Sequence, residues 1–259
     1  MRLRQIAFAA EKLAPAEETL LDVLGLEVGF RDPGVGEFGL ENGVIPVGGN
    51  FLEIVAPVEE GTTAGRFLVN RGGDAGYMVL LHTADAAPTR ARAEKLGIRA
   101  VWHHDRDGAD ATHFHPKDVG GVILSVDSFA SEPEPAAKMA YWRWGGPDWQ
   151  DHVRDTVTAE MTGVTLVNPD PAKQAATWSS LLDLPVLAVT DDQGEGFDMV
   201  LPDGGIIRFR PPTPDVTAGI TAIDFRMNDR AAALTRAAAH GLPADTDGFT
   251  MMQVRCNLA

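Results

Sequence analysis

The sequence repeats one order of predicted elements, a strand and a helix followed by three strands, and this order limits the folds open to the chain. In the first repeat Leu20, Leu21 and Leu24 share one helical face, and Gly25 ends the helix. Apolar or alternating runs between turn residues predict the strands. The helix is Pro15–Leu24, and the strands are Arg2–Ala10, Leu26–Arg31, Phe38–Val47 and Phe51–Ala56.

The same order recurs twice, and a fourth repeat starts near the C-terminus. Leu24–Val28 parallels Leu182–Val186, and Ala93–Gly97 parallels Ala237–Gly241, as internal repeats predict. The later helices are Pro88–Leu96, Pro171–Leu182 and Arg230–His240. The later strands are Tyr77–His82, Ala100–His103, Gly163–Asn168, Val186–Val189, Phe197–Leu201, Ile206–Arg210 and Ile220–Met227. The fourth repeat is expected to be short, because Asp247–Leu258 can supply at most two strands.

The second repeat closes with a predicted hairpin, Ala111–Asp127. Its first strand ends at Pro116, which cannot donate to a sheet, and Gly120–Gly121 provides a tight turn before a second, buried strand. His113 and His115 are two residues apart, so we expect them to face the same side of the first strand. Solvation or hydrogen bonding is the commoner role for such a pair, and metal binding is the less common one.

The hairpin also resembles a known family. His115-Pro116-Lys117, followed by Gly121–Leu124, is similar to the closing hairpin of the methylmalonyl-CoA epimerases, which belong to the vicinal oxygen chelate superfamily. The resemblance implies an α+β fold in which tandem βαβββ modules form two glyoxalase-like half-open barrels. The expected domains are residues 1–128 and a second, degenerate domain, 155–259. The segment 129–154 between them is rich in aromatic residues, which we expect either to pack the two halves together or to cover a pocket.

The resemblance implies metal ligands on the first and last strands of each module. Gln5 and Glu53 match two of these positions, and their oxygens suit a hard divalent ion. In the second module the alignment gives Tyr77 or Met78, and Ser125 replaces the family's glutamate. The ligand set is therefore incomplete, although neighbouring histidines could complete it: His82, His103, His104, His113 and His115.

The second half departs further from the ligand pattern. Its matching positions are Gly163, Arg208 and Ala222, and an arginine would repel a cation. Arg208 could bind a carboxylate or phosphate, but an ordinary ion pair is the simpler expectation. We therefore interpret the second half as a degenerate copy.

Composition excludes several classes of protein. The net charge of −15 argues against broad nucleic-acid binding, and no apolar run is long enough for a transmembrane helix. With Cys256 as the single cysteine and no signal peptide, the expected location is the cytoplasm. No dinucleotide or phosphate-binding fingerprint and no serine nucleophile motif is present. The expected partner is a small molecule, and a homodimer is left open.

Three functions are consistent with these residues. The first is a lyase or isomerase, including epimerases, acting on a small carbonyl, hydroxy-acid or thioester substrate, with Glu53 as base or metal ligand and Gln5 beside it. In this hypothesis Tyr77, His113, His115 and Ser125 are candidate ligand-binding residues. The second is a metal-free binding protein of the bleomycin-resistance type. An extradiol-type dioxygenase is least favoured, because its two-histidine, one-carboxylate triad has no match at the expected positions.

Overall fold

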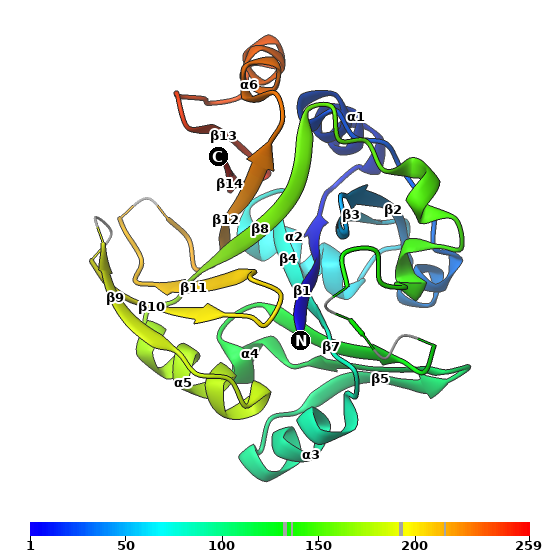
Figure 1. The fold of residues 1–259 in the computed structure, drawn as a ribbon, viewed down its shortest axis with the longest axis vertical. Coiled ribbons are helices and arrows are strands. Elements are labelled where there is room, and N and C mark those ends of the chain that lie inside the picture. The colour runs from blue at the N-terminus through cyan, green and yellow to red at the C-terminus, as the bar shows by residue number, and fades with distance from the viewer. Residues whose placement is uncertain (132–133, 136, 192–193, 215) are drawn as a thin grey trace. The chain divides into compact units, whose positions relative to one another are not determined.

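The computed structural model describes residues 1–131, 134–135, 137–191, 194–214 and 216–259, and its helices and strands form two compact units (Figure 1). Unit 1 comprises Met1–Arg4, Met78–Tyr141 and Gly163–Thr221, and unit 2 comprises Gln5–Tyr77, Trp142–Thr162 and Ala222–Ala259. Each unit therefore combines two repeats: the second and third in unit 1, and the first and fourth in unit 2.

Unit 2 contains the first repeat, in which strand β3 lies between β2 and β1. β2 (Leu40–Val47) is antiparallel to β3 (Asn50–Pro57), and β3 is parallel to β1 (Arg2–Ala9). Apolar residues predominate in these strands, and nearly every position is buried, including the polar Gln5, Asn42 and Glu53. The remaining first-repeat elements are helix α1 (Leu13–Leu24), the 3-10 helix η1 (Pro33–Phe38) and helix α2 (Thr63–Arg71).

The strand predicted at Leu26–Arg31 is wrong: this segment is irregular and makes one bridge, between Phe30 and Val44. The Glu17–Arg31 ion pair crowds Gly43, where an added Cβ would lie 2.3 Å from the Glu17 carboxylate. Asp32 then caps η1 by accepting from the Gly34 N–H at 2.8 Å. Gly29 and Phe30 both donate their N–H groups to the Val44 carbonyl, so the pairing of this segment with β2 stops at the single bridge.

The fourth repeat also lies in unit 2 and is short, as expected. β12 (Gly219–Met227) is parallel to β14 (Val254–Leu258), which is antiparallel to β13 (Gly248–Met251). Helix α6 (Arg230–Ala239) connects β12 to this pair, and Asp229 caps it. Within the described part of the chain, two strands follow α6, as in the first repeat, whereas three follow the helices of the second and third repeats.

The second repeat, in unit 1, has the strand order β4–β7–β6–β5. β7 (Ile123–Phe129) is parallel to β4 (Ala75–His82) and antiparallel to β6 (Ala109–Phe114), which pairs with β5 (Ala100–Arg106). Helix α3 (Ala87–Leu96) joins β4 to β5. All positions of β7 are buried, as predicted for the second strand of the hairpin.

The tight turn predicted in Ala111–Asp127 is wrong, because the short helix α4 (Pro116–Val119) stands between β6 and β7. Pro116 occupies the first helical position, where a missing N–H costs nothing. His115 lies outside the strand and caps α4, since its Nδ1 accepts from the Lys117 N–H at 3.1 Å. His113 and His115 therefore do not share a strand face.

The third repeat packs against that helix within unit 1. β8 (Thr158–Val167) is parallel to β11 (Ile206–Arg210), and β10 (Gly194–Val200) lies between β11 and β9 (Leu187–Asp191). Helix α5 (Pro171–Leu182) presents Trp178, whose indole N–H donates to the Val119 carbonyl at 2.8 Å. This bond satisfies a carbonyl at the end of α4 that the helix itself leaves open.

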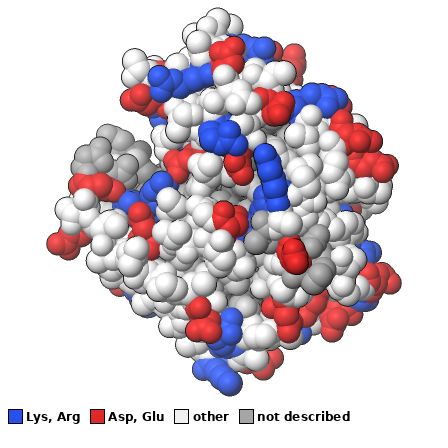
Figure 2. All heavy atoms as spheres, in the orientation of Figure 1, with Lys and Arg blue, Asp and Glu red and all other residues white. Residues whose placement is uncertain are grey.

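No helix in the described residues combines the length and apolar character that a bilayer crossing needs. Acidic and basic side chains are interspersed on the face drawn in Figure 2.

Candidate functional site

Glu53 and Gln5 lie together in unit 2. Glu53 on β3 pairs with Ala7 of β1, and Gln5 lies two residues before Ala7, so both side chains project from the same face of the sheet. Gln5 Nε2 donates to Glu53 Oε2 at 2.8 Å. Asn42 of β2 donates through Nδ2 to Glu53 Oε1 at 2.6 Å. Each oxygen of the buried carboxylate thus accepts an amide N–H.

Two further donors fix which way these amides point. The Trp142 indole N–H donates to Gln5 Oε1 at 2.7 Å, and the Asp32 backbone N–H donates to Asn42 Oδ1 at 2.9 Å. An N–H can only donate, so the amide atom that receives it must be the oxygen. The NH₂ groups of Gln5 and Asn42 must then face Glu53, and neither amide can flip without losing two bonds.

This environment changes the proton affinity of Glu53. Its side chain is buried, and burial raises the pKa of the carboxyl from 4.5 to about 7. The hydrogen bonds from Asn42 and Gln5 oppose this rise because they favour the charged form, and the nearby charge of Asp32 reinforces it. A carboxyl with a pKa near 7 can take and release a proton at neutral pH.

Aromatic residues cover Gln5. Trp142 and Trp149 are fully buried, and both contact Phe51 of β3. The Trp142 ring stacks on Phe51 at 6.4 Å between centroids, and Trp149 meets it edge-on at 4.9 Å. These two residues of the aromatic segment pack on β3 within unit 2, and whether the segment covers a pocket stays a prediction.

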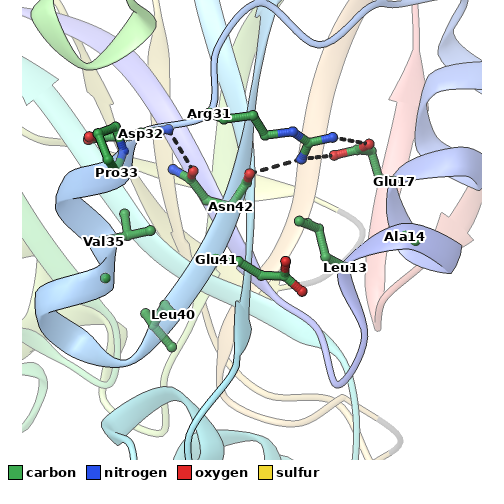
Figure 3. Close-up of a pocket in the computed structure, with 11 residues that line it drawn as sticks. Leu13, Ala14, Glu17, Arg31, Asp32, Pro33, Val35, Leu40, Glu41 and Asn42 are labelled. Carbon is green, nitrogen blue, oxygen red and sulfur yellow. Dashed lines mark hydrogen bonds and ion pairs between the residues drawn. The ribbon is translucent and has the colours of Figure 1, made fainter.

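A cavity of about 600 Å³ borders Asn42 on the side of η1 and α1 (Figure 3). Arg31 and Glu17 form a two-fold ion pair at its rim, and Figure 3 shows Arg31 also bonding the Asn42 carbonyl. The rest of the lining includes the apolar side chains of Leu13, Val35 and Leu40 and the acidic side chains of Asp32 and Glu41. Asn42 lines this cavity and also donates its side-chain amide to Glu53.

The arrangement around Glu53 does not fit the divalent metal of the superfamily. A cation needs oxygen lone pairs directed at it, whereas Gln5 and Asn42 direct N–H groups at the carboxylate and turn their oxygens to other donors. Among the residues that the structure describes, no group of three His, Cys, Asp or Glu side chains could hold a metal.

Strand register identifies the equivalent positions in the other repeats. In the first repeat Glu53 pairs with Ala7, and Gln5 lies two residues before Ala7 on the same strand. In the second repeat Ser125 pairs with Leu80, so the position equivalent to Gln5 is Met78. Tyr77 instead packs on Phe67 of α2 at 4.8 Å, and burial raises the pKa of its hydroxyl to about 12.

His113 and Ser125 are brought side by side in unit 1 as partners on β6 and β7. Ser125 is fully buried and donates to Asp127 at 2.5 Å. His113 stacks on Trp102 at 4.5 Å between centroids, and burial lowers the pKa of its imidazole to about 4, so it is neutral at physiological pH. The assignment of ligand-binding roles to His113, His115, Ser125 and Tyr77 stays a prediction.

The third and fourth repeats have the same strand pairing as the first repeat, but different residues stand at the positions of Gln5 and Glu53. Arg208 pairs with Thr165, two residues after Gly163, so Arg208 does stand at the position equivalent to Glu53. In the fourth repeat Asp224 lies two residues after Ala222 and pairs with Asn257, so Asn257 stands at the position equivalent to Glu53. Asn257 donates to Asp224 at 2.8 Å. Neither pair reproduces the Gln5–Glu53 contact.

Sequence analysis did not identify Asn42 or the role of Trp142. Asn42 carries a weak signal, because it is a polar residue directly before a buried strand core and lies opposite Val55. Trp142 lies 137 residues from Gln5, and no pattern in the sequence joins them.

Comparison with known proteins agrees with this fold. A family model described as a glyoxalase-like domain matches residues 6–182. A hypothetical protein from Staphylococcus aureus is similar over 99% of this chain and 98% of its own, at 10% identity and a TM-score of 0.66. A triple mutant of 4-hydroxymandelate synthase from Streptomyces coelicolor is similar over 93% of this chain and 75% of its own, at 15% identity and a TM-score of 0.67.

A variant of methylmalonyl-CoA epimerase from Streptomyces coelicolor, in complex with 2-nitronate-propionyl-CoA, matches 50% of this chain and 98% of its own, at 22% identity and a TM-score of 0.45. No curated protein matches the chain significantly. The two longer structural matches show a shared fold and confirm the predicted α+β architecture of tandem modules. Because the family model covers more than half of the sequence, the chain belongs to the glyoxalase-like domain family of the vicinal oxygen chelate superfamily.

Proposed function

We propose that the protein is an enzyme of the isomerase or lyase type, in which Glu53 is the general base toward a small carbonyl, hydroxy-acid or thioester substrate. The observation that carries the proposal is the state of Glu53: burial raises the pKa of its carboxyl to about 7, and its two oxygens are held by Gln5 and Asn42. A base works best when its pKa lies near the operating pH.

The reaction that suits such a group is removal of a proton next to a carbonyl. The Glu53 carboxylate takes the proton, the C–H bond breaks, and its electron pair moves to the carbonyl oxygen as an enolate. Delivery of a proton from water to the opposite face of the same carbon inverts it, as in an isomerase, and departure of a substituent from the next carbon with its bonding electrons gives a lyase; in both cases Glu53 then releases its proton to water. Gln5 and Asn42 keep the carboxylate in one orientation through this cycle.

The test is proton exchange in D₂O with a panel of 2-methyl and 2-hydroxy acyl thioesters and short 2-oxo acids, followed by NMR. The wild type should replace the α-hydrogen of at least one class with deuterium. Glu53→Gln should slow that exchange by about 100-fold or more. Glu18→Gln, an exposed change on α1, is the matched control. Equal exchange by wild type and Glu53→Gln would remove the proposed role.

A second candidate, a metal-free small-molecule-binding protein of the bleomycin-resistance type, is favoured by the cavity beside Asn42. Its volume of about 600 Å³ suits a compact ligand, and its lining offers both apolar and charged contacts. Under this function a ligand raises the melting temperature of wild type and Glu53→Gln equally, and no substrate of the panel exchanges its α-hydrogen.

A further inference from the structure

Gln5 can help Glu53 only if its amide points the right way, and its own strand does not decide that. An amide is nearly symmetric in shape, so the same rotamer can present either its oxygen or its NH₂ to the carboxylate. An oxygen facing Glu53 would repel the negative charge, whereas an NH₂ stabilises it. Once Glu53 takes a proton, its O–H could instead donate to the amide oxygen, so a further group is needed to hold the NH₂ toward Glu53 in both protonation states.

Trp142 is that group. Its indole nitrogen carries a hydrogen and is a donor only, and it lies 2.7 Å from Gln5 Oε1. The indole is fully buried and packed on Phe51, so it cannot swing away without opening the aromatic cover. A flipped Gln5 would place its NH₂ against the indole N–H and lose both hydrogen bonds inside a buried site.

We propose that Trp142 is a positioning residue, which fixes the Gln5 amide so that its NH₂ faces Glu53 and holds the carboxylate as a base in one orientation. The chain of contacts runs from the indole N–H to Gln5 Oε1 and from Gln5 Nε2 to Glu53 Oε2, at 2.7 and 2.8 Å. This inference rests on the proposed role of Glu53 and assigns a function to the aromatic segment.

The test is a titration of the Glu53 carboxyl by ¹³C NMR, assigned by comparison with Glu53→Gln. Trp142→Phe removes the N–H and keeps an aromatic ring against Phe51. It should raise the pKa of Glu53 by about one unit, since the Gln5 amide can then turn its oxygen to the protonated carboxyl and favour the neutral form. Trp149→Phe is the matched control, because Trp149 is equally buried and also packs on Phe51. It should leave the titration unchanged.

A double-mutant comparison separates positioning from packing. Gln5→Leu should raise the pKa of Glu53 by a similar amount, and adding Trp142→Phe to Gln5→Leu should add no further shift. Independent, additive shifts would overturn the inference. If Trp142→Phe does not fold, a benzothiophene analogue of tryptophan at position 142 keeps the ring shape and removes the donor, and it should give the same shift.

The outcomes distinguish this inference from the proposed function. A wild-type Glu53 that titrates near 7, with no shift in either the Trp142→Phe or the benzothiophene protein, contradicts the positioning role and leaves the base intact. A wild-type Glu53 that titrates near 4.5 contradicts the proposed base itself. The first result is read from the variants and the second from the wild type alone.

Discussion

Asn42 donates its side-chain amide to Glu53 Oε1 at 2.6 Å while its own oxygen accepts the Asp32 backbone N–H. Asn42 therefore joins a buried carboxyl to the loop that enters η1 and to the wall of a cavity. Through this contact a change at the cavity can reach the proton affinity of Glu53.

Replacing Glu53 with Gln should make folding stability less dependent on pH. In the folded protein the pKa of Glu53 is raised from 4.5 to about 7, so the folded state holds the proton more tightly than the unfolded state. The contribution of this group to stability is full below pH 4.5 and is lost as pH rises through 7, a difference of about 3 kcal/mol at most. Urea denaturation at pH 5 and pH 8 should show a larger loss in wild type than in Glu53→Gln. An identical loss in both proteins would contradict this account.

Asn42→Asp should place a second carboxyl against Glu53. Two adjacent carboxylates cannot both ionise cheaply, so the pair should share one proton and titrate in two separate steps. The variant should be less stable than wild type at pH 8 by about 2 kcal/mol or more and should recover most of that loss at pH 5. Denaturation curves at the two pH values measure the effect. A loss that is the same at both pH values would point to packing instead of charge.

How far the sequence predicts this molecule depends on the range of each interaction. The helix Pro171–Leu182 and the strand Ile206–Arg210 were predicted to the residue, because capping and apolar spacing are local. The expected strand Leu26–Arg31 was wrong, because Gly29 and Phe30 both donate to the Val44 carbonyl and the pairing with β2 ends at one bridge. Helix α2 was not predicted, although Thr62 supplies its N-cap by accepting from the Gly65 N–H.

In the candidate site, too, local patterns could be predicted from the sequence and contacts between distant residues could not. Gln5 and Glu53 could be proposed from a short family pattern, and the structure brings them into contact. Whether Tyr77 or Met78 is equivalent to Gln5 depends on a one-residue shift in strand register, which the sequence alone leaves open. The pairing of Leu80 with Ser125 assigns the position to Met78. Trp142 could not be predicted, because its bond to Gln5 joins residues from distant parts of the chain.

No divalent cation should bind stoichiometrically at Glu53. Its carboxylate is surrounded by the amide N–H groups of Gln5 and Asn42, and a cation would have to displace both. Elemental analysis of the native protein, and calorimetric titration with Zn²⁺ and Ni²⁺, should therefore give the same result for wild type and Glu53→Gln. One equivalent of metal that disappears in Glu53→Gln would show that the amides turn to admit it.

In the third repeat, Arg210 should matter far more for stability than Arg208. Arg210 is nearly fully buried and pairs with both Asp191 and Asp198 at 2.8 Å. Arg210→Ala leaves these carboxylates without their cation and should cost about 3 kcal/mol. Arg208→Ala, two residues earlier on β11, should cost about 1 kcal/mol or less and should leave ligand binding in the first repeat unaltered. Urea denaturation ranks the two variants. Loss of anion binding in Arg208→Ala without loss of stability would instead indicate a second site.

We propose that the fold prepares Glu53 as a base that works near neutral pH. The most direct measurement is the ¹³C NMR titration of the Glu53 side-chain carboxyl in the wild-type protein, identified by its absence in Glu53→Gln. Burial raises the pKa of this carboxyl more than the hydrogen bonds from Asn42 and Gln5 lower it, and the expected value is about 7. A midpoint near 4.5, the ordinary value for a glutamate, would show that water or a cation reaches the carboxylate and would contradict the claim.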